Sequence, residues 1–143
     1  GLCVIFGMEY DTPDGDFLLF GPFENLKPGM PVRRLLQTVA ASGGIAVAAH
    51  PLRRSRPVRE FIFRDGFCNI VENRNGRNTP DENLQVDFWV RKYGLTCCAG
   101  SDAHSLSELG RMVTCFSSPI TSRLDLIQAL TSGKLEALVA DAA

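Results

Sequence analysis

The stretch Gly94-Leu-Thr-Cys-Cys-Ala-Gly-Ser-Asp-Ala-His104 begins with an apolar run and ends with two side chains that can bind a metal. Residues 94–99 predict a buried strand. In an extended chain, side chains two residues apart point to the same side. We therefore expect Asp102 and His104 to leave the carboxyl end of this strand together, where open α/β sheets and barrels bind their ligands.

This pair admits two interpretations. A carboxylate and an imidazole suit a divalent transition metal such as zinc, iron or manganese. Alternatively, Asp102 caps a turn and His104 makes an ordinary hydrogen bond. The residues at the other strand ends of the chain bear on this choice.

The composition narrows the class of protein. A chain of 143 residues with 45% hydrophobic content can bury the core of one domain, which we expect over residues 1–143. The charges nearly cancel, with 15 basic and 16 acidic residues, so neither a nucleic-acid nor a membrane surface is indicated. No apolar run approaches the roughly 18–20 residues of a membrane span, and we expect no signal peptide. The five cysteines form no C-x-x-C pair, which indicates reduced, buried thiols in a cytoplasmic protein.

Strands and helices are expected to alternate along the chain. Such alternation is typical of parallel βα units and argues against a sandwich or a helix bundle. Apolar side chains such as Leu84, Phe88, Leu124 and Leu130 are expected to face the core from their helices. The predicted strands cover residues 2–6, 17–20, 45–49, 66–71, 94–99 and 112–116, and the predicted helices cover 31–41, 80–93 and 122–132, with a short turn or helix at 105–109 and a last strand or tail at 136–140.

Four of the predicted strands end beside residues that can bind metals. Glu9, His50 and Glu72 each follow an apolar run, as the pair Asp102 and His104 does. The carboxyl ends of parallel strands meet at one edge of a sheet. The convergence of these side chains therefore favours the metal site over isolated structural roles.

Four motifs occur along the chain in a fixed order. They are Gly7-Met-Glu9, Gly43-Gly-Ile-Ala-Val-Ala-Ala-His-Pro51, Val71-Glu-Asn-Arg-Asn-Gly-Arg77, and Ala99-Gly-Ser-Asp-Ala-His104 followed by Leu109-Gly110. Over residues 2–116 their order and spacing resemble the PHP (polymerase and histidinol phosphatase) domain family. The resemblance is strongest to the C-terminal, PHP-associated portion of its metal-dependent phosphoesterases. It implies an α/β fold, namely a partial, distorted (β/α)7-type barrel with a mainly parallel sheet, whose first strands with their H-x-H segment are missing here.

The resemblance also implies a set of metal ligands at the strand ends. Glu9 matches a carboxylate that bridges two metals, His50 matches the A-H-P ligand, and Asp102 and His104 match the closing D-x-H pair. Many relatives carry a further histidine where this chain has Asp14-Gly-Asp16. Asp16 is there either an oxygen ligand or a solvated turn residue. The implied cofactors are divalent zinc, manganese or iron.

Arginines surround these motifs and have two possible roles. Arg53, Arg54 and Arg77 could bind a substrate phosphate beside the metals, because guanidinium matches phosphate geometry. The other possibility is a solvated surface, and it applies equally to the neighbouring Arg56. We interpret Glu72, Asn73 and Asn75 as residues that hold a loop backbone by hydrogen bonds.

Two hypotheses follow for function. In the first, the chain or a longer parent protein is a phosphoesterase that hydrolyses a phosphorylated small molecule or nucleotide-like substrate with metal-activated water. In the second, it is a truncated or degenerate, non-catalytic PHP-like module with a metal-binding, structural or interaction role. Missing strands leave sheet edges exposed. We therefore expect a homo-oligomer, or a cover formed by the irregular segment 21–31.

Overall fold

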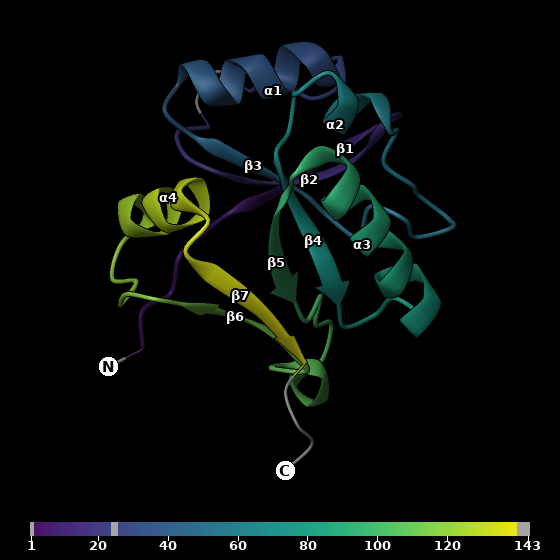
Figure 1. Cartoon of the computed structure of the whole chain (residues 1–143). Coiled ribbons are helices and arrows are strands. Elements are labelled where there is room, and N and C mark those ends of the chain that lie inside the picture. Colours follow the sequence, from purple (N-terminus) through teal and green to yellow (C-terminus); the bar gives the residue numbers. More distant parts are fainter. Residues whose placement is uncertain (1, 24–25, 140–143) are drawn as a thin grey trace.

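Short apolar runs separated by glycine- and proline-rich turns form the larger of two β-sheets. The computed structural model describes residues 2–23 and 26–139, and Figure 1 shows their arrangement. The five strands of this sheet lie side by side in chain order. They are β1 (Met8–Thr12), β2 (Gly15–Phe20), β3 (Ile45–Ala48), β4 (Ile70–Asn75) and β5 (Thr96–Gly100).

The direction of the strands agrees with the predicted α/β class. A two-residue turn between Thr12 and Gly15, which pair with each other, makes β1 and β2 an antiparallel hairpin. Strand β2 is also antiparallel to β3, whereas β3, β4 and β5 are parallel neighbours. Four of the five strands therefore run in one direction and only β2 opposes them. The carboxyl ends of β3, β4 and β5 thus share one edge with the start of β2.

The sheet is open across the described part of the chain, so the predicted barrel is not shown. Strands β6 (Met112–Phe116) and β7 (Leu135–Val139) form a separate antiparallel hairpin. Side chains join this hairpin to β5. The Thr114 hydroxyl donates to the Ala99 carbonyl at 2.8 Å and accepts the Ala99 N–H at 2.9 Å.

Two apolar layers cover the two faces of the larger sheet. On one face, Phe17, Leu19 and Val71 pack against α1 (Val32–Ala41), α2 (Phe61–Arg64) and α3 (Pro80–Tyr93). On the other, Val47 and Cys98 pack against α4 (Arg123–Ser132) and the β6–β7 hairpin. Figure 1 shows α3 and α4 on opposite sides of β4 and β5. Across the described residues, no helix combines the length and apolar character that a membrane span requires.

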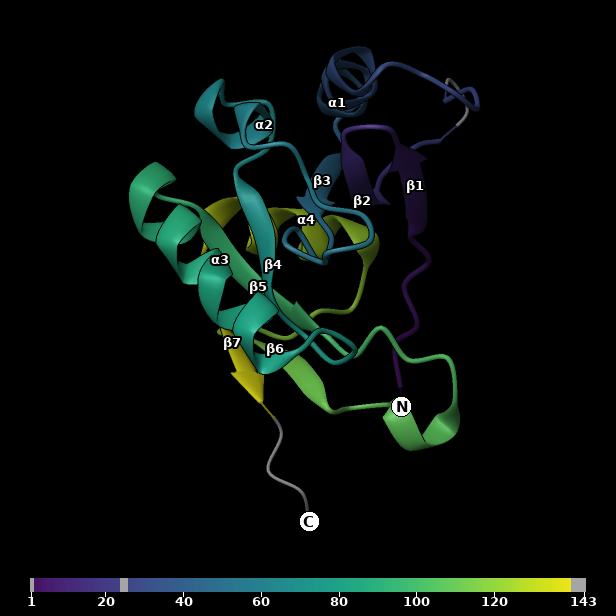
Figure 2. The ribbon, with the colours of Figure 1, turned by 90° about the vertical axis from the view of Figure 1, so that its right-hand side faces the viewer.

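Two strand boundaries differ from the sequence prediction. Residues 2–6 are not a strand, and Glu9 lies inside β1, because the hairpin register pairs Met8 with Leu19 and assigns residues 2–6 no partner. Leu2 and Phe6 are 93% and 82% exposed, and Figure 2 shows this stretch leading into β1 from outside the sheet. Strand β4 begins at Ile70 rather than at residue 66, since residues 65–69 form the turn after α2.

Helix α3 has the predicted bounds but a different buried face. Its capping box joins Thr79 and Glu82, and Gly94 ends it with a φ of 64°. Leu84 and Phe88 are 61% and 58% exposed, contrary to the prediction. The reason is that Asn83 forms hydrogen bonds with Asn75 of β4, which turns another face of the helix toward the sheet.

Asn83 holds α3 against β4 through two hydrogen bonds. Its Oδ1 accepts the Asn75 N–H and its Nδ2 donates to the Asn75 carbonyl, each at 3.0 Å. In α4, similarly, Leu130 is buried as predicted whereas Leu124 is 61% exposed. Apolar periodicity alone therefore did not reveal which face of either helix is buried.

Several smaller predictions concern the ends and loops. A 3-10 turn covers Leu106–Glu108. Of the strand or tail predicted at 136–140, the strand is confirmed as β7, and residue 140 lies outside the described residues. The segment 21–31 likewise contains residues 24–25, which are not described. Beyond that gap, the Met30 N–H donates to the Tyr10 hydroxyl of β1 at 2.8 Å. All five cysteines are free, and Cys3 and Cys115 are exposed rather than buried as predicted.

Candidate metal centre

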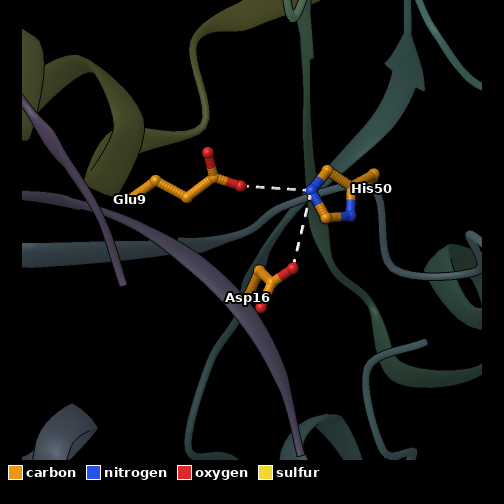
Figure 3. Close-up of side chains that lie close together, drawn as sticks. All are labelled: Glu9, Asp16 and His50. Atoms are coloured by element: carbon orange, nitrogen blue, oxygen red, sulfur yellow. Dashed lines mark hydrogen bonds and ion pairs between the residues drawn. The ribbon is translucent and has the colours of Figure 1, made fainter. Parts of the chain in front are cut away.

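Three side chains with metal-binding atoms converge at one edge of the larger sheet. Glu9, Asp16 and His50 each offer one ligand atom, and these atoms lie within 4.8 Å of one another. His50 Nε2 is 3.2 Å from Glu9 Oε1 and 3.9 Å from Asp16 Oδ2. Figure 3 shows both carboxylates directed at this ring nitrogen. Of the predicted site residues, the fold brings these three together.

The strand register explains why the two carboxylates meet. Glu9 pairs with Leu18 across the hairpin, so the two side chains lie on the same face. Asp16 precedes Leu18 by two residues and shares that face. The Ala49 N–H donates to the Asp16 carbonyl at 3.0 Å, which brings the end of β3, and His50 after it, beside Asp16. Asp16 is thus a buried strand residue, 3% exposed, and not a solvated turn residue.

His50 occupies a constrained turn at the end of β3. Its φ is 29°, in the left-handed region, and it precedes Pro51. A non-glycine residue held there costs on the order of 1–3 kcal/mol and persists only when its surroundings fix it. Its side chain is 4% exposed, and Nδ1 is buried without a hydrogen-bond partner among the described residues.

The donor set fits one divalent metal ion. One ring nitrogen faces two carboxylates, and imidazole with carboxylate oxygens suits zinc, iron or manganese. Three protein ligands leave a coordination position for water, as catalytic sites do. Glu9 has a half-exposed side chain, so the centre is open to solvent on that side. These side chains could therefore hold an ion that is accessible to a substrate.

Arg56 balances part of the negative charge at this centre. Its Nη2 lies 2.7 Å from Asp16 Oδ1 and 3.4 Å from Asp11 Oδ2. The hydrogen bond to Asp16 and the Asp16 charge raise the pKa of Arg56 above its ordinary value. Because Arg56 contacts Oδ1, the other oxygen of Asp16 remains directed toward His50.

The Asp102 and His104 pair does not join the three side chains. Strand β5 ends at Gly100, and Asp102 has a φ of 51°, so the extended geometry assumed from the sequence is absent at this turn. The Asp102 carboxylate instead lies 2.6 Å from Arg53 Nη2. The side chain of His104 is 67% exposed, and its Nδ1 is 2.9 Å from the Asp102 carbonyl oxygen.

Arg53 is the anchor of this second region. Its Nη2 also donates to Asn75 Oδ1 and its Nε donates to Asn78 Oδ1, both at 3.0 Å. Burial acts to raise the pKa of Asp102, but the hydrogen bond and charge of Arg53 prevail and the pKa is lowered. The other two arginines predicted to bind phosphate, Arg54 and Arg77, are exposed.

The sequence did not reveal the role of Glu72, predicted to hold a loop. Glu72 lies inside β4, is 3% exposed, and accepts the backbone N–H of His50 at 2.9 Å. Asn75 Nδ2 donates to the same carboxylate oxygen at 2.8 Å. Burial, as the largest effect, raises the pKa of Glu72. The available signal was the polar run 73–75 directly after an apolar strand, which indicates an irregular strand end.

Together, the fold and this cluster define an α/β protein with a candidate metal centre at its strand ends. A family model described as PHP-associated matches residues 80–135. This match covers α3, β5, β6 and α4, including the D-x-H motif. Residues 80–135 are therefore similar to the PHP-associated family.

Two curated proteins and a crystal structure are among the proteins to which this chain is similar. An uncharacterized protein of Methanocaldococcus jannaschii is 27% identical over 119 residues, which cover 78% of this chain and 50% of that protein. A 5'-3' exoribonuclease of Haemophilus influenzae is 32% identical over 74 residues, 48% of this chain and 27% of that protein. The crystal structure of PsfC from Pseudomonas syringae has a TM-score of 0.77 at 19% identity, covering 94% of this chain and 59% of that one. The chain thus spans half or less of these curated relatives, and the structural likeness concerns the fold alone.

Proposed function

We propose that Glu9, Asp16 and His50 bind a divalent zinc, manganese or iron ion in a metal-dependent phosphoesterase. The convergence of their ligand atoms within 4.8 Å carries this proposal. The sequence resemblance supports it, because it implies ligand roles for Glu9 and His50, and the PHP-associated match over residues 80–135 includes the D-x-H motif of the same resemblance. Asp102 and His104, which the resemblance also implies as ligands, are left out of this proposed site, because Arg53 holds the Asp102 carboxylate.

In this proposal, different side chains bind the metal ion and the substrate phosphate during phosphate ester hydrolysis. A bound metal ion lowers the pKa of its water so that hydroxide is available near neutral pH. His50, almost fully buried, fixes one ligand position, and the half-exposed Glu9 lies on the side open to substrate. We assign the exposed Arg54 and Arg77 to the binding of substrate phosphate, with Arg53 as the residue that orders this surface.

The proposed substrate is a phosphate ester of a small molecule or a nucleotide-like compound. The relative named 5'-3' exoribonuclease supports a nucleotide-like phosphodiester among the candidates. Because this chain spans 27% of that protein, the activity is assigned to the chain or to a longer parent protein. The five free thiols suit a reducing compartment, and we place the protein in the cytoplasm.

Metal binding tests this proposal, with the second histidine as a matched control. We expect elemental analysis and Mn²⁺ or Zn²⁺ titration to give about one equivalent per chain for the wild type and His104→Ala. The His50→Ala variant should lose this equivalent, because it removes the buried ligand. A wild-type chain that binds no divalent metal would overturn the proposal. Hydrolysis of a chromogenic phosphate ester by the metal-loaded chain then tests the catalytic part.

A non-catalytic interaction module is the second candidate. Two observations favour it: Arg53 holds the Asp102 carboxylate, and Leu2, Val4 and Phe6 are exposed apolar residues beside the edge strand β1. In this proposal a second copy of the chain pairs with that edge. Size-exclusion chromatography should then show a dimer whose population rises with concentration. A monomer at every concentration would contradict it.

A further inference from the structure

We propose that Glu72 is a positioning residue, whose buried carboxylate holds the backbone of His50 so that the imidazole faces Glu9 and Asp16. The metal-binding consequence rests on the proposed function, in which His50 is a ligand. The positional consequence stands on the protein's own contacts. None of the sequence motifs assigned Glu72 to His50.

The parallel ladder between β3 and β4 ends just before the site. Ala48 and Val71 are its paired residues, so the N–H of His50 has no strand partner there. Glu72 Oε2 supplies the acceptor at 2.9 Å. On the other side of the turn, the Arg53 N–H donates to the His50 carbonyl at 2.9 Å. The left-handed backbone of His50 is therefore held from both sides, once by a side chain and once by the main chain.

An irregularity in β4 places the side chain of Glu72. Glu72 pairs with Cys98 and Arg74 pairs with Ala99, so Asn73 is an extra residue in this strand. Residues three apart in a regular strand point to opposite faces, but the extra residue brings Asn75 to the face of Glu72. Asn75 Nδ2 donates to Glu72 Oε2 at 2.8 Å and fixes the carboxylate that holds His50.

Strand β5 provides the space for this carboxylate. Gly100 faces Glu72, and a Cβ atom at that position would collide with Glu72 Oε1. The backbone of Gly100 does not have a positive φ, so a glycine is not required there for conformation. Its missing side chain instead leaves room for the carboxylate group. Strand β4, its extra residue and the β5 glycine thus act together on the orientation of His50.

Three variants separate the hydrogen bond from charge and from volume. Glu72→Met keeps the approximate volume and removes the acceptor. Glu72→Gln keeps one oxygen that can accept both N–H groups. Glu82→Met is the matched control, because Glu82 is also buried, at 9% exposed, and accepts the Arg54 N–H at 2.9 Å without contacting His50. If Glu72→Met does not fold, Glu72→Asp, which shortens the side chain by one methylene, gives the same comparison.

The ring resonances of the two histidines report position without any metal. In metal-free protein, NMR should show the His50 ring signals shifted in Glu72→Met and close to wild type in Glu72→Gln and Glu82→Met. The exposed His104 serves as the internal reference. In parallel, the Mn²⁺ or Zn²⁺ affinity should fall about 10- to 100-fold in Glu72→Met, as removal of a residue that orients a ligand does, and stay within about threefold in Glu72→Gln.

Unchanged His50 signals in Glu72→Met, or an equal shift in Glu82→Met, would overturn the inference. Failure of the proposed function looks different, because the wild type itself would then bind no metal. In that case a His50 shift confined to Glu72→Met still supports the positioning role.

Discussion

The two histidines of the chain lie in opposite surroundings. The side chain of His50 is 4% exposed and faces two carboxylates, whereas that of His104 is 67% exposed and contacts its own turn. Both stand at the end of a parallel strand, and the D-x-H motif is the more conspicuous one in the sequence. The difference arises beyond the strand ends: Glu72 holds the backbone of His50, while the positive φ of Asp102 directs the chain away. A short motif therefore marks a position on the sheet, and neighbouring strands decide which side chains meet.

Of the substitutions that test this difference between the two histidine regions, removal of Arg53 should change the free energy of unfolding most. In Arg53→Met the half-buried Asp102 loses its cation, and three hydrogen bonds to Asp102, Asn75 and Asn78 disappear. We expect the free energy of unfolding to fall by about 2 kcal/mol in urea denaturation. Metal stoichiometry should remain near one.

The exposed neighbour Arg54 provides the control for this variant. Arg54→Met should change the unfolding free energy by less than about 0.5 kcal/mol. If Arg53→Met bound a second metal equivalent, the proposed difference between His50 and His104 would be wrong. Asp102 and His104 would then form a metal site that Arg53 blocks.

A methyl group at Gly100 tests whether the space beside Glu72 is needed for metal binding at His50. In Gly100→Ala the new Cβ collides with Glu72 Oε1 and displaces the carboxylate that holds His50. We expect metal affinity to fall about tenfold, which corresponds to about 1.4 kcal/mol. Gly66→Ala is the control, because Gly66 lies in the turn after α2 and no atom lies near its new Cβ. The φ of 70° at Gly66 makes alanine unfavourable there, so this variant should lose stability but keep its metal affinity. Equal metal affinities in the two variants would show that the space beside Glu72 is irrelevant.

The smallest expected effect concerns an ion pair that belongs to neither histidine region. Arg74 donates to both oxygens of Asp87 at 2.9 Å, and this hydrogen bonding, as the largest cause, lowers the pKa of Asp87. The stabilisation is therefore present above the unfolded pKa of about 3.9 and is lost as the pH falls through the lower folded value. Asp87→Asn should cost about 1 kcal/mol at pH 7.

Urea denaturation at a series of pH values tests this prediction. The difference between wild type and Asp87→Asn should shrink toward zero as the pH falls below about 4. Metal affinity should be unchanged. A difference independent of pH would mean that the substitution perturbs packing and not the charge pair, and a change in metal affinity would show that the His50 region extends to α3.

The sequence predicted the α/β class, the bounds of α3 and β6, and the participation of Glu9 and His50 in one cluster. These features follow from local signals: apolar runs, a capping box and glycine stops determine elements within a few residues. The exact bounds of α3, for example, follow from Thr79, Glu82 and Gly94.

The remaining features depend on contacts between distant parts of the chain. Leu84 is exposed because Asn83 docks on Asn75. Asp16 is buried because the hairpin register places it beside Ala49. The extra residue Asn73 brings Asn75 toward Glu72, and no periodicity in the sequence reveals it. Register, bulges and polar docking are properties of pairs of strands, so a single stretch of sequence does not encode them.

The contact between β5 of the larger sheet and the β6–β7 hairpin is the place where we expect the molecule to open first. Hydroxyl groups bridge it, with Thr114 on Ala99 and Ser101 on the Met112 carbonyl, in place of a continuous backbone ladder between β5 and β6. Breaking it leaves every strand pair in both sheets intact. We therefore predict that the β6–β7 hairpin with α4 separates as its own cooperative unit once its apolar contacts with Val47 and Cys98 are also broken, and that its amides exchange with solvent before those of β3 and β4 do. In kinetic terms, we predict that the face of the sheet that carries the His50 centre becomes uncovered before the sheet itself unfolds.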